Sequence, residues 1–596
     1  MSNYDDNFLS HFEAELQSLD EAFDSFAKKF PRTVANGQFS RTSNDPHVRL
    51  ILDSFSFLHA RMAVRVEEQK ALVPAAILEE LSPTLIECFP STCFVKFSPD
   101  AEKPIGSDGF NLARNTRLVA EPGNKKQYFF QTVYDTLILP ISASELFSES
   151  PIEKPFFQKE VRSVVGFNLS GVGCNIDQVS APTFRFFIDA PFRTAGKFRE
   201  FLLSKVLKLV FYNETTGESV QLGSESIKSV GMDESEFFAS YRYQAHPSFE
   251  LLKEYSAEPR KFLYFEINNP KLQSSDNKLT CLFGFGDPLP SWFDVANILL
   301  IPNVVPVINR FKKQAEPIRL NDRQVEFEVN PGNKDDSHFQ VNSIDKIHYT
   351  APGLAEAEEI YSFFAHSGVD HEEDLNKYWF AKYSYDPLNG QSCRISLVDG
   401  RLQGSASDGH ILVPTIICSN PTASTDVMVG QFLKADFELP CSAKVMTQLT
   451  EEIDRCYDDE ILWRLVSQMK AAYGSLDQFE DSVRNAENFT NLCSAYVPSN
   501  KKEVLNELKA INSLNFDKVS RRVGSSFSFA EGLKASMLVD EKAFVESNMY
   551  LFCEILNQML SMFVSCNSFV ELHSSGTGDG EDWIKWEIGL GGKEII

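Results

Sequence analysis

The stretch Asn303-Val-Val-Pro-Val-Ile-Asn-Arg-Phe-Lys-Lys-Gln-Ala-Glu-Pro-Ile-Arg-Leu320 stands near the middle of the chain, and Phe339-Gln-Val-Asn-Ser-Ile-Asp-Lys-Ile-His348 follows it. Its first part is apolar and rich in β-branched residues, which predicts a strand. The Ala315-Glu-Pro317 segment comes next, and proline fixes its own φ and cannot donate a backbone hydrogen bond. We therefore expect an elbow between strands, which acts either as a partner contact or hinge, or as a rigid interstrand turn.

The chain is too long for one hydrophobic core. With 596 residues, 43% of them hydrophobic and 23% charged, its composition is globular, and it should divide into roughly three or four domains of about 150 residues. We expect a helical region over 1–92, β-rich domains over 93–310 and 311–430, and an α+β domain over 431–596. The 50 Phe side chains carry no polar group and indicate large buried cores, large interfaces, or both.

The formal net charge is −26 and the sequence pI is about 4.9. Such an acidic chain is a poor nucleic-acid binder, because phosphate contacts require Lys and Arg. Its field also opposes docking on anionic lipid and suits basic protein partners. A general acidity of the source proteome explains the charge equally well.

The cysteines and the chain start predict a cytoplasmic protein. The 11 Cys include no C-x-x-C pair, which is typical of a reduced compartment. The acidic start Met1-Ser-Asn-Tyr-Asp-Asp lacks the features of a signal peptide. No run of about 18 apolar residues occurs, so we expect membrane association only through partners.

Three helices are predicted at the N-terminus. Residues 5–30 carry a narrow apolar seam with spacings of three and four residues. A second helix is expected from Asn44-Asp-Pro46 to Lys70, and a third over Ala75–Leu81. The seam favours packing against another helix, either between subunits or within this chain's own domain. Its residues are the candidate partner interface, together with Ala315, Glu316 and Pro317: Phe12, Leu16, Leu19, Phe23, Phe26 and Phe30.

From about Phe94 to Ile347 the hydrophobic period changes to two, which predicts mostly antiparallel β structure. Gly430–Pro440 is interpreted as a linker. Helices are expected over Leu449–Ala472 and Phe544–Cys566, with strands between and after them. This order of elements predicts an α+β multidomain protein.

No catalytic, cofactor-binding or metal-binding residue is predicted. His366 and His371 lie near acidic residues, but their spacing does not stack two ligands on one helix face. The Gly166–Gly173 run lacks the Lys of a phosphate-binding loop, and Gly576–Asp582 is interpreted as a polar hairpin loop. We therefore expect a protein that is not an enzyme.

Three long segments resemble the TssF family of the bacterial type VI secretion system. The run from Asn303 to Leu320 is similar to the family pattern N-x-x-P-V-x-N-x-F-x-x-x-A-E-P-I-R-L. The N-terminal runs Phe12–Leu19 and Asp45–Arg61 are also similar, with Phe12 where the family usually has Tyr. Towards the C-terminus, Leu462-Trp-Arg-Leu-Val-Ser467 and Phe552–Phe569 continue the resemblance.

The resemblance implies a structural baseplate wedge subunit with a fold related to the wedge proteins of contractile phage tails. It implies assembly with TssG, TssK and a second TssF copy around the VgrG hub, with TssE and sheath proteins nearby. The implied role is mechanical: holding the hub and coupling baseplate rearrangement to sheath contraction. It implies no cofactor, and recruitment to a baseplate docked on the inner membrane.

Two other functions stay open on the sequence. A wedge protein of a phage-tail-like contractile particle would share the architecture, and neighbouring genes would distinguish it. A β-rich carbohydrate-active hydrolase would need a pair of carboxylates in a cleft, and its activity would fall when one carboxylate was removed.

Overall fold

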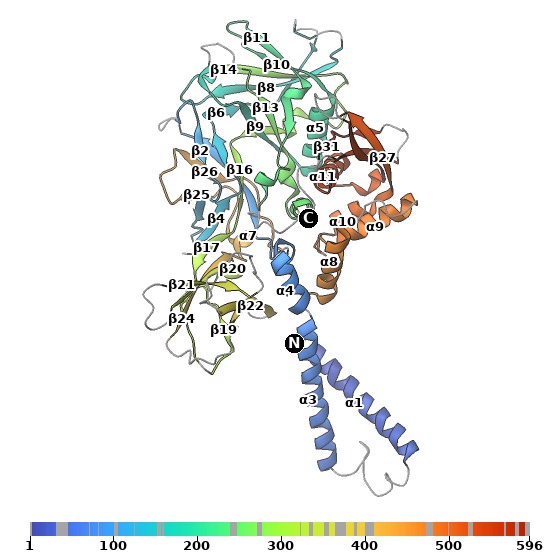
Figure 1. Cartoon of the computed structure of the whole chain (residues 1–596). Helices are drawn as coiled ribbons and strands as arrows, with labels where there is room; N and C mark the ends of the chain where they lie inside the picture. Colours follow the sequence, from blue (N-terminus) through green and yellow to red (C-terminus); the bar gives the residue numbers. More distant parts are fainter. Residues whose placement is uncertain are drawn as a thin grey trace.

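The protein consists of a β-rich body with a helical arm that projects from it (Figure 1). The structure, a computed structural model of the whole chain, describes residues 3–30, 46–70, 72–81, 83–100, 105–123, 126–151, 156–157, 160–238, 247–270, 277–321, 323–332, 338–350, 357–363, 377–386, 390–399, 410–472, 481–498, 500–522, 529–564, 568–577 and 583–590. The protein combines helices with mostly antiparallel sheets, which confirms the predicted α+β class.

The arm consists of α1 (Asn3–Lys29) and α3 (Pro46–Lys70), and α4 (Leu72–Leu81) joins it to the body. All three predicted N-terminal helices are confirmed. Pro46 occupies the first position of α3, where its missing N–H needs no intrahelical partner. Lys28 and Lys29 lie in the last turn of α1, where they oppose the negative end of the helix dipole.

A closed six-stranded barrel lies in the middle of the body (Figure 1). Its strands, in order around the barrel, are β1 (Thr92–Pro99), β16 (Val304–Ile308), β4 (Tyr128–Thr132), β3 (Arg117–Ala120), β25 (Phe432–Ala435) and β26 (Cys441–Val445). Strands from two of the four expected sequence segments, 93–310 and 431–596, therefore meet in one barrel. Every strand is paired on both sides, which leaves the barrel no edge.

Asn303 is the corner at which the chain enters the barrel. It separates β15 (Leu299–Pro302), which pairs with β9 (Thr183–Asp189), from the barrel strand β16. Its φ of 58° is left-handed, a conformation that Asn tolerates better than most residues. Its side chain accepts a hydrogen bond from Leu139 N at 2.9 Å and donates to Leu139 O at 2.7 Å. Asn303 thus replaces a strand partner where the chain changes sheets.

Asn309 joins the barrel to the next sheet at the other end of β16. Its Nδ2 donates to Phe129 O at 2.8 Å and to Asn420 Oδ1 at 3.0 Å, and Asn420 N donates to Asn309 Oδ1 at 2.5 Å. Both Asn side chains are fully buried. Phe129 belongs to the barrel, whereas Asn420 follows directly after β24 (Ile411–Ser419). This buried clamp fixes the two parts of the body against each other.

An eight-stranded sheet begins directly after the clamp. Its strands are β17 (Phe311–Gln314), β18 (Ile318–Arg319), β19 (Glu326–Glu328), β20 (Gln340–Thr350), β21 (Glu358–Ser362), β22 (Lys377–Asp386), β23 (Gly390–Asp399) and β24. Both β17 and β18 pair with β24, so residues 311–319 run along one strand after the chain leaves the barrel.

Two further sheets cover the other end of the barrel (Figure 1). Their remaining strands and the helix packed on them are β6 (Ile141–Ala143), β7 (Phe147–Glu149), β8 (Ser163–Gly171), β10 (Val206–Tyr212), β11 (Ser219–Gly223), β12 (Ile227–Ser229), β13 (Tyr264–Asn268), β14 (Lys278–Phe285) and α5 (Phe192–Lys205). Many of the Phe side chains pack in this core, with Phe167, Phe186 and Phe265 fully buried.

The C-terminal part is an α+β layer on one side of the body (Figure 1). Its elements are α8 (Asp459–Ala472), α9 (Ser482–Ser494), α10 (Lys502–Lys509), β27 (Ile511–Arg522), β28 (Phe529–Val539), α11 (Met549–Met562), β29 (Ser568–Gly576), β30 (Ile584–Lys585) and β31 (Gly589–Leu590). Helix α11 packs against α6 (Pro247–Ala257) of the central body, so the C-terminal part and the body share one hydrophobic core.

Two local predictions are wrong. The segment Gly430–Pro440 is no linker, because it contains β25, which closes the barrel. The helix expected over Leu449–Ala472 begins only at Asp459. Residues 446–456 instead run extended beside residues 86–94, and distant backbone partners outweigh the local preference for helix.

Replacing Asn309 should destabilise the body at the clamp. Asn309→Ala removes three hydrogen bonds and leaves Phe129 O and Asn420 buried without these partners, so we expect a loss of about 2–4 kcal/mol of unfolding free energy. Asn506→Ala, at an exposed position of α10, is the control. Equilibrium urea unfolding measures both losses, and hydrogen exchange should increase over 411–420. Equal stability of the two variants would contradict the clamp.

Candidate assembly surface and its support

Helix α3 has two apolar faces. Its buried residues Ser56, Ala60 and Val64 recur every four positions, and α1 packs against α3. These small side chains allow a close approach of the two helices. A second set lies on the opposite side of α3, at spacings of four, three, four and four, and is exposed by 55–66%: Ile51, Phe55, Leu58, Met62 and Val66. We call this second set the outer stripe.

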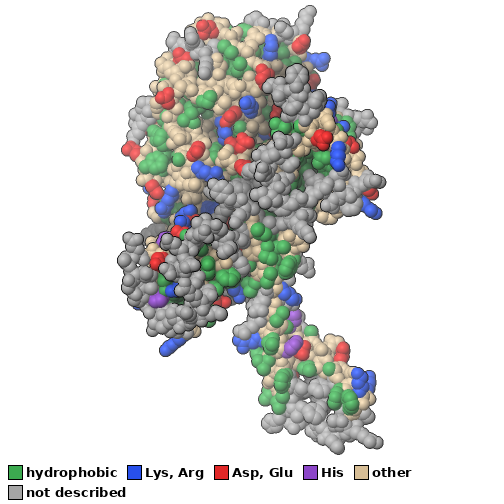
Figure 2. Space-filling model, in the orientation of Figure 1, with side chains coloured by type: hydrophobic (Ala, Val, Ile, Leu, Met, Phe, Trp, Pro, Cys, Tyr) green, Lys and Arg blue, Asp and Glu red, His purple; other side chains and the backbone are tan. Residues whose placement is uncertain are grey.

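The outer stripe has no partner among the residues that the structure describes. Hydrophobic side chains along the arm are visible in Figure 2. A helix that is apolar on opposite faces is normally buried on both. Full burial of five such side chains contributes on the order of 5 kcal/mol, enough to hold a helix in a bundle. The arm therefore presents an exposed apolar surface, and the main part of it is on α3.

The predicted seam of α1 lies partly against α3. Leu16 is buried, and Phe12 and Leu19 are half-buried. Phe26 and Phe30 near the end of α1 are exposed by 46% and 53%, with ring centroids 5.1 Å apart. The side chain of Phe23 lies outside the described part of the structure. The role of this seam between subunits stays a prediction.

The Ala315-Glu316-Pro317 elbow lies between β17 and β18. Ala315 is buried, and its N–H donates to Pro414 O at 2.9 Å. Glu316 N donates to Asn330 O at 3.0 Å, while the Glu316 and Pro317 side chains are exposed. The backbone of the elbow is thus held in place and its outer side is accessible. Its role as a partner contact or a hinge stays a prediction.

The base of the arm is fastened by a strap, residues 446–456. The strap forms backbone hydrogen bonds at both ends of residues 86–94: Met446 N donates to Phe94 O at 2.8 Å, and Cys456 N donates to Ile86 O at 3.1 Å. Between them, Ile453 exchanges hydrogen bonds with Phe89. After the strap, α8 packs against α4. A C-terminal segment therefore holds the junction of arm and barrel.

Arg455 on the strap connects the arm to the eight-stranded sheet. Its guanidinium forms an ion pair with Glu79 on α4 and lies 3.8 Å from the centre of the Tyr383 ring on β22. The Arg455 side chain is only 4% exposed. Burial raises the pKa of Glu79 to about 7, although the Arg455 charge opposes the increase. One buried side chain thus connects the strap to α4 and to the eight-stranded sheet.

Glu452 makes a second connection from the strap to the same sheet. Its Oε1 accepts hydrogen bonds from Ser419 Oγ at 3.0 Å and from Gln340 Nε2 at 3.2 Å. Its Oε2 is buried and has no hydrogen-bond partner among the described residues. Burial raises the pKa of Glu452 to about 7. The carboxyl therefore takes up a proton near neutral pH.

A buried ion pair lies on the body side of the arm base. Glu254 on α6 and Lys261 on η6 (Pro259–Phe262) form an ion pair with both side chains fully buried. Glu254 Oε1 also accepts from Phe238 N at 2.5 Å. Burial raises the pKa of Glu254 to about 7 against the opposing charge of Lys261. Nearby, Lys253 Nζ donates to the backbone oxygens of Thr84 and Glu87, directly below α4.

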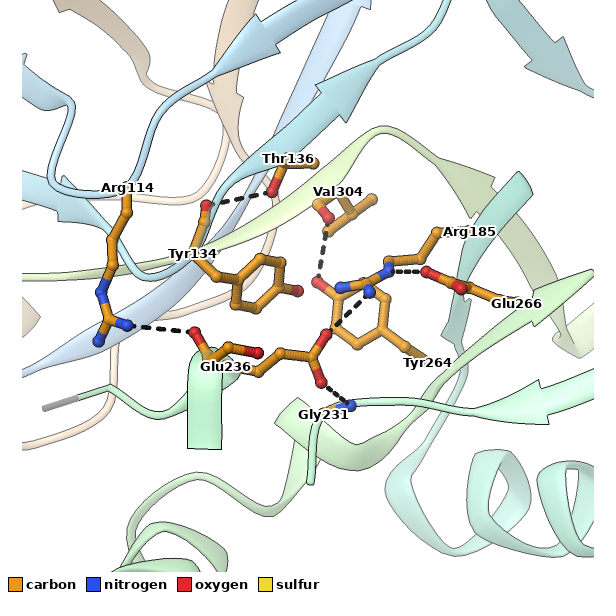
Figure 3. A network of polar contacts seen from close by, with 10 residues as sticks. Arg114, Tyr134, Thr136, Arg185, Gly231, Glu236, Tyr264, Glu266 and Val304 are labelled. Atoms are coloured by element: carbon orange, nitrogen blue, oxygen red, sulfur yellow. Dashed lines mark hydrogen bonds and ion pairs between the residues drawn. The ribbon is translucent and has the colours of Figure 1, made fainter. Parts of the chain in front are cut away.

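A network of polar contacts surrounds Arg185 (Figure 3). Its guanidinium pairs with Glu236 at 2.8 Å and Glu266 at 2.7 Å and lies over the Tyr134 ring. Glu236 also accepts from Gly231 N at 2.6 Å. Burial raises the pKa of Tyr134 to about 12. Both carboxylates are occupied by one cation, so the network supports the fold and offers no acid–base pair.

No group of three metal-ligating side chains occurs within the described ranges. His366 and His371 lie outside those ranges, as does most of the Gly576–Asp582 loop. None of the described helices is both long and apolar enough to span a membrane.

Comparison with known proteins decides the family. A family model described as "Type VI secretion system, TssF" matches residues 4–593, nearly the whole chain. The chain belongs to the TssF family. The resemblance expected from the three sequence segments is thereby confirmed.

Individual TssF relatives agree with this result. The type VI secretion system component TssF1 of Pseudomonas aeruginosa is 22% identical, and the match covers 98% of this chain and 99% of the relative. A solved TssK–TssF–TssG baseplate subcomplex contains a chain with a TM-score of 0.72 at 16% identity, covering 91% of this chain and 99% of that one. A chain of a baseplate complex from the type VI secretion system gives a TM-score of 0.58 at 15% identity, covering 99% and 100%. The fold is thus that of a TssF baseplate component.

Sequence reasoning missed the main surface of this TssF family member. The periodicity of α3 was visible through Phe55, Met62 and Val66, but periodicity does not show which face another helix covers. The signal lay in the small residues Ser56 and Ala60, which indicate a close packing face opposite the large ones. Arg455 and Glu452 carried no local signal, because their partners are distant in sequence.

Removing the cation of the buried pair should destabilise the protein more than removing both charges. Lys261→Met leaves Glu254 buried without its partner, so we expect a loss of about 3–5 kcal/mol. The double variant Lys261→Met with Glu254→Gln should lose clearly less, because Gln still accepts from Phe238 N. Urea unfolding compares the two. Equal losses would show that the charges do not interact in the folded protein.

Stability should depend on Glu452 between about pH 4.5 and pH 7. Its folded pKa is raised from 4.5 to about 7, so the folded state binds the proton more tightly. The unfolding free energy gained from this bound proton is complete below pH 4.5 and is lost as the pH rises through 7. Glu452→Gln cannot titrate, so its unfolding free energy should fall less steeply from pH 5 to pH 8. Glu503→Gln, exposed on α10, should follow the unchanged protein. Identical slopes for all three proteins would refute a proton on Glu452.

Proposed function

We propose that this TssF family member is a wedge subunit of the baseplate of a type VI secretion machine and has no catalytic role. It assembles with TssG, TssK and a second copy of itself around the VgrG hub, next to TssE and the sheath. It is cytoplasmic and is recruited to a baseplate docked on the inner membrane. The observation that carries the proposal is the outer stripe, an apolar face with no partner among the described residues of this chain.

The outer stripe suits an intersubunit helical bundle. Its spacing of three and four residues forms a seam that matches another helix, and its side chains are large enough to interdigitate. The expected neighbours are helices of TssG and of the second copy, because the solved relative is a TssK–TssF–TssG subcomplex. The exposed Phe26 and Phe30 pair would extend the same bundle at the end of α1.

The support of the arm fits a mechanical role. A movement of the arm acts on α4 through one helical connection, and α4 is held by α8 and by the Arg455–Glu79 pair. Arg455 also contacts Tyr383, so the eight-stranded sheet receives the same displacement. These contacts favour a subunit that couples baseplate rearrangement to sheath contraction.

The chemistry within the described ranges favours a structural protein. The carboxylates nearest to a catalytic pair, Glu236 and Glu266, are both bound to Arg185. Burial raises the thiol pKa of Cys93 and Cys393, which makes them poor nucleophiles. A phage-tail-like particle remains the second candidate, because the arm and body suit any contractile wedge. The genes beside this one distinguish the two.

Charges placed on the outer stripe should prevent assembly without unfolding the protein. Leu58→Asp with Met62→Asp changes side chains exposed by 56% and 65%, so the isolated chain should keep its thermal midpoint. Burial of two unpaired carboxylates in the bundle should abolish co-purification with TssG and TssK. Val325→Asp, at a 78% exposed apolar position on the body, is the control and should assemble normally. Normal assembly of the double variant would overturn the proposed interface.

A further inference from the structure

A row of three side chains crosses the outer face of the barrel. Lys96 on β1 lies opposite Lys444 on β26, and Lys444 lies opposite Phe432 on β25. All three side chains are exposed, and Phe432 is exposed by 63%. The Lys444 ammonium lies 5.8 Å from the centre of the Phe432 ring. We call these residues the Lys–Phe row.

The two lysines of the row repel each other, and neither has an acidic partner within the described ranges. Like charges directly opposite on neighbouring strands destabilise a sheet. No carboxylate lies within ion-pair distance of Lys96 or Lys444 among the described residues. The Lys96 charge acts on Asp189 only from beyond ion-pair distance, and it lowers the pKa of Asp189 less than Arg260 does. In contrast, Lys434 on the same face pairs with Glu121 at 3.0 Å. In a chain of net charge −26, two adjacent unpaired lysines suit an acidic partner.

A cavity opens beside the lysine end of the row. It has a volume of about 270 Å³ and lies between β1, β6 and β15. Lys96, Ser98 and Glu145 are among its polar lining residues, so charges of both signs line it, while Ile141, Leu300 and Pro302 supply apolar lining. This volume accommodates one or two side chains and is too small for a long segment of backbone.

The opposite end of the row is an exposed apolar turn. Met428 and Val429 precede Phe432 and are exposed by 71% and 56%. The turn is fixed, because Gly430 N donates to Val445 O at 2.8 Å and Gly430 adopts a φ of 93° that side chains rarely adopt. The apolar side chains are therefore held outward by an ordered backbone.

We propose that the Lys–Phe row is a docking surface for an extended acidic segment of another polypeptide. One apolar side chain of that segment enters the cavity beside Lys96, its carboxylates pair with Lys96 and Lys444, and a second apolar side chain packs on Phe432. Two strand spacings separate Lys96 from Phe432, about 10 Å. Because successive side chains of an extended chain point to opposite faces, a segment that presents these four side chains on one side is about seven residues long.

This surface goes beyond the proposed wedge role and is separate from the arm, because its residues belong to the barrel. Assembly through the outer stripe can therefore be followed independently in every variant. If a variant of the row fails to assemble, the proposed wedge role is affected. If it assembles normally but the row captures no acidic segment, only the docking surface is overturned.

Site-specific photo-cross-linking in cells that assemble the machine tests the proposal. Phe432→p-benzoylphenylalanine places the reactive group on the row, and Val325→p-benzoylphenylalanine is the matched exposed apolar control. Mass spectrometry of the product should identify one segment of another polypeptide that is rich in Asp and Glu. The same segment, as a synthetic peptide, should bind the purified full chain and be released by added salt.

Charge variants complete the test. Lys96→Glu with Lys444→Glu should weaken binding of that peptide by roughly tenfold or more, because like charges then face each other. Lys434→Glu should have a smaller effect, since Lys434 already pairs with Glu121. Cross-linking no stronger than at Val325, a cross-link to a second copy of this chain, a product without acidic residues, or unchanged binding by the double variant would each overturn the proposal.

Discussion

The architecture depends on how two buried asparagines hold one strand. The segment from Leu299 to Ile308 leaves one sheet, turns at Asn303 and becomes a wall of the barrel. Asn303 replaces a missing strand partner for Leu139, and Asn309 binds the barrel and Asn420 at the same time. An amide side chain both donates and accepts, so it satisfies a backbone N–H and C=O together. Without these two residues the barrel, the upper sheets and the eight-stranded sheet would meet at unpaired backbone groups, which are costly to bury.

The arm is useful because the body resists its movement. Distant segments converge where α4 leaves the barrel: the strap pairs with residues 86–94, Arg455 links Glu79 to Tyr383, and Lys253 binds the backbone below α4. The polar groups at this base are buried, so their interactions are only weakly screened by salt. An apolar outer stripe on an arm held in this way is consistent with the proposed mechanical role.

Local features were predictable from the sequence, and distant pairings were not. Phe12, Leu16 and Leu19 and the proline at position 46 identified the arm helices, because helical period and caps are local properties. Strand β25 was mistaken for a linker, because Gly430 and Pro440 are turn residues and Val119, the barrel partner of Lys434, is distant in sequence. The candidate interface residues on α1 were predicted from their period alone, whereas the outer stripe of α3 required knowing which face α1 covers. The family resemblance carried the function, since no side-chain constellation did so.

Native mass spectrometry of this chain co-expressed with TssG and TssK from the same organism tests whether the chain is a baseplate subunit. We predict a discrete complex that contains TssG, TssK and a second copy of this chain, held by the arm. A monomer that ignores both partners, while remaining folded, would contradict the claim that this protein is a baseplate wedge subunit.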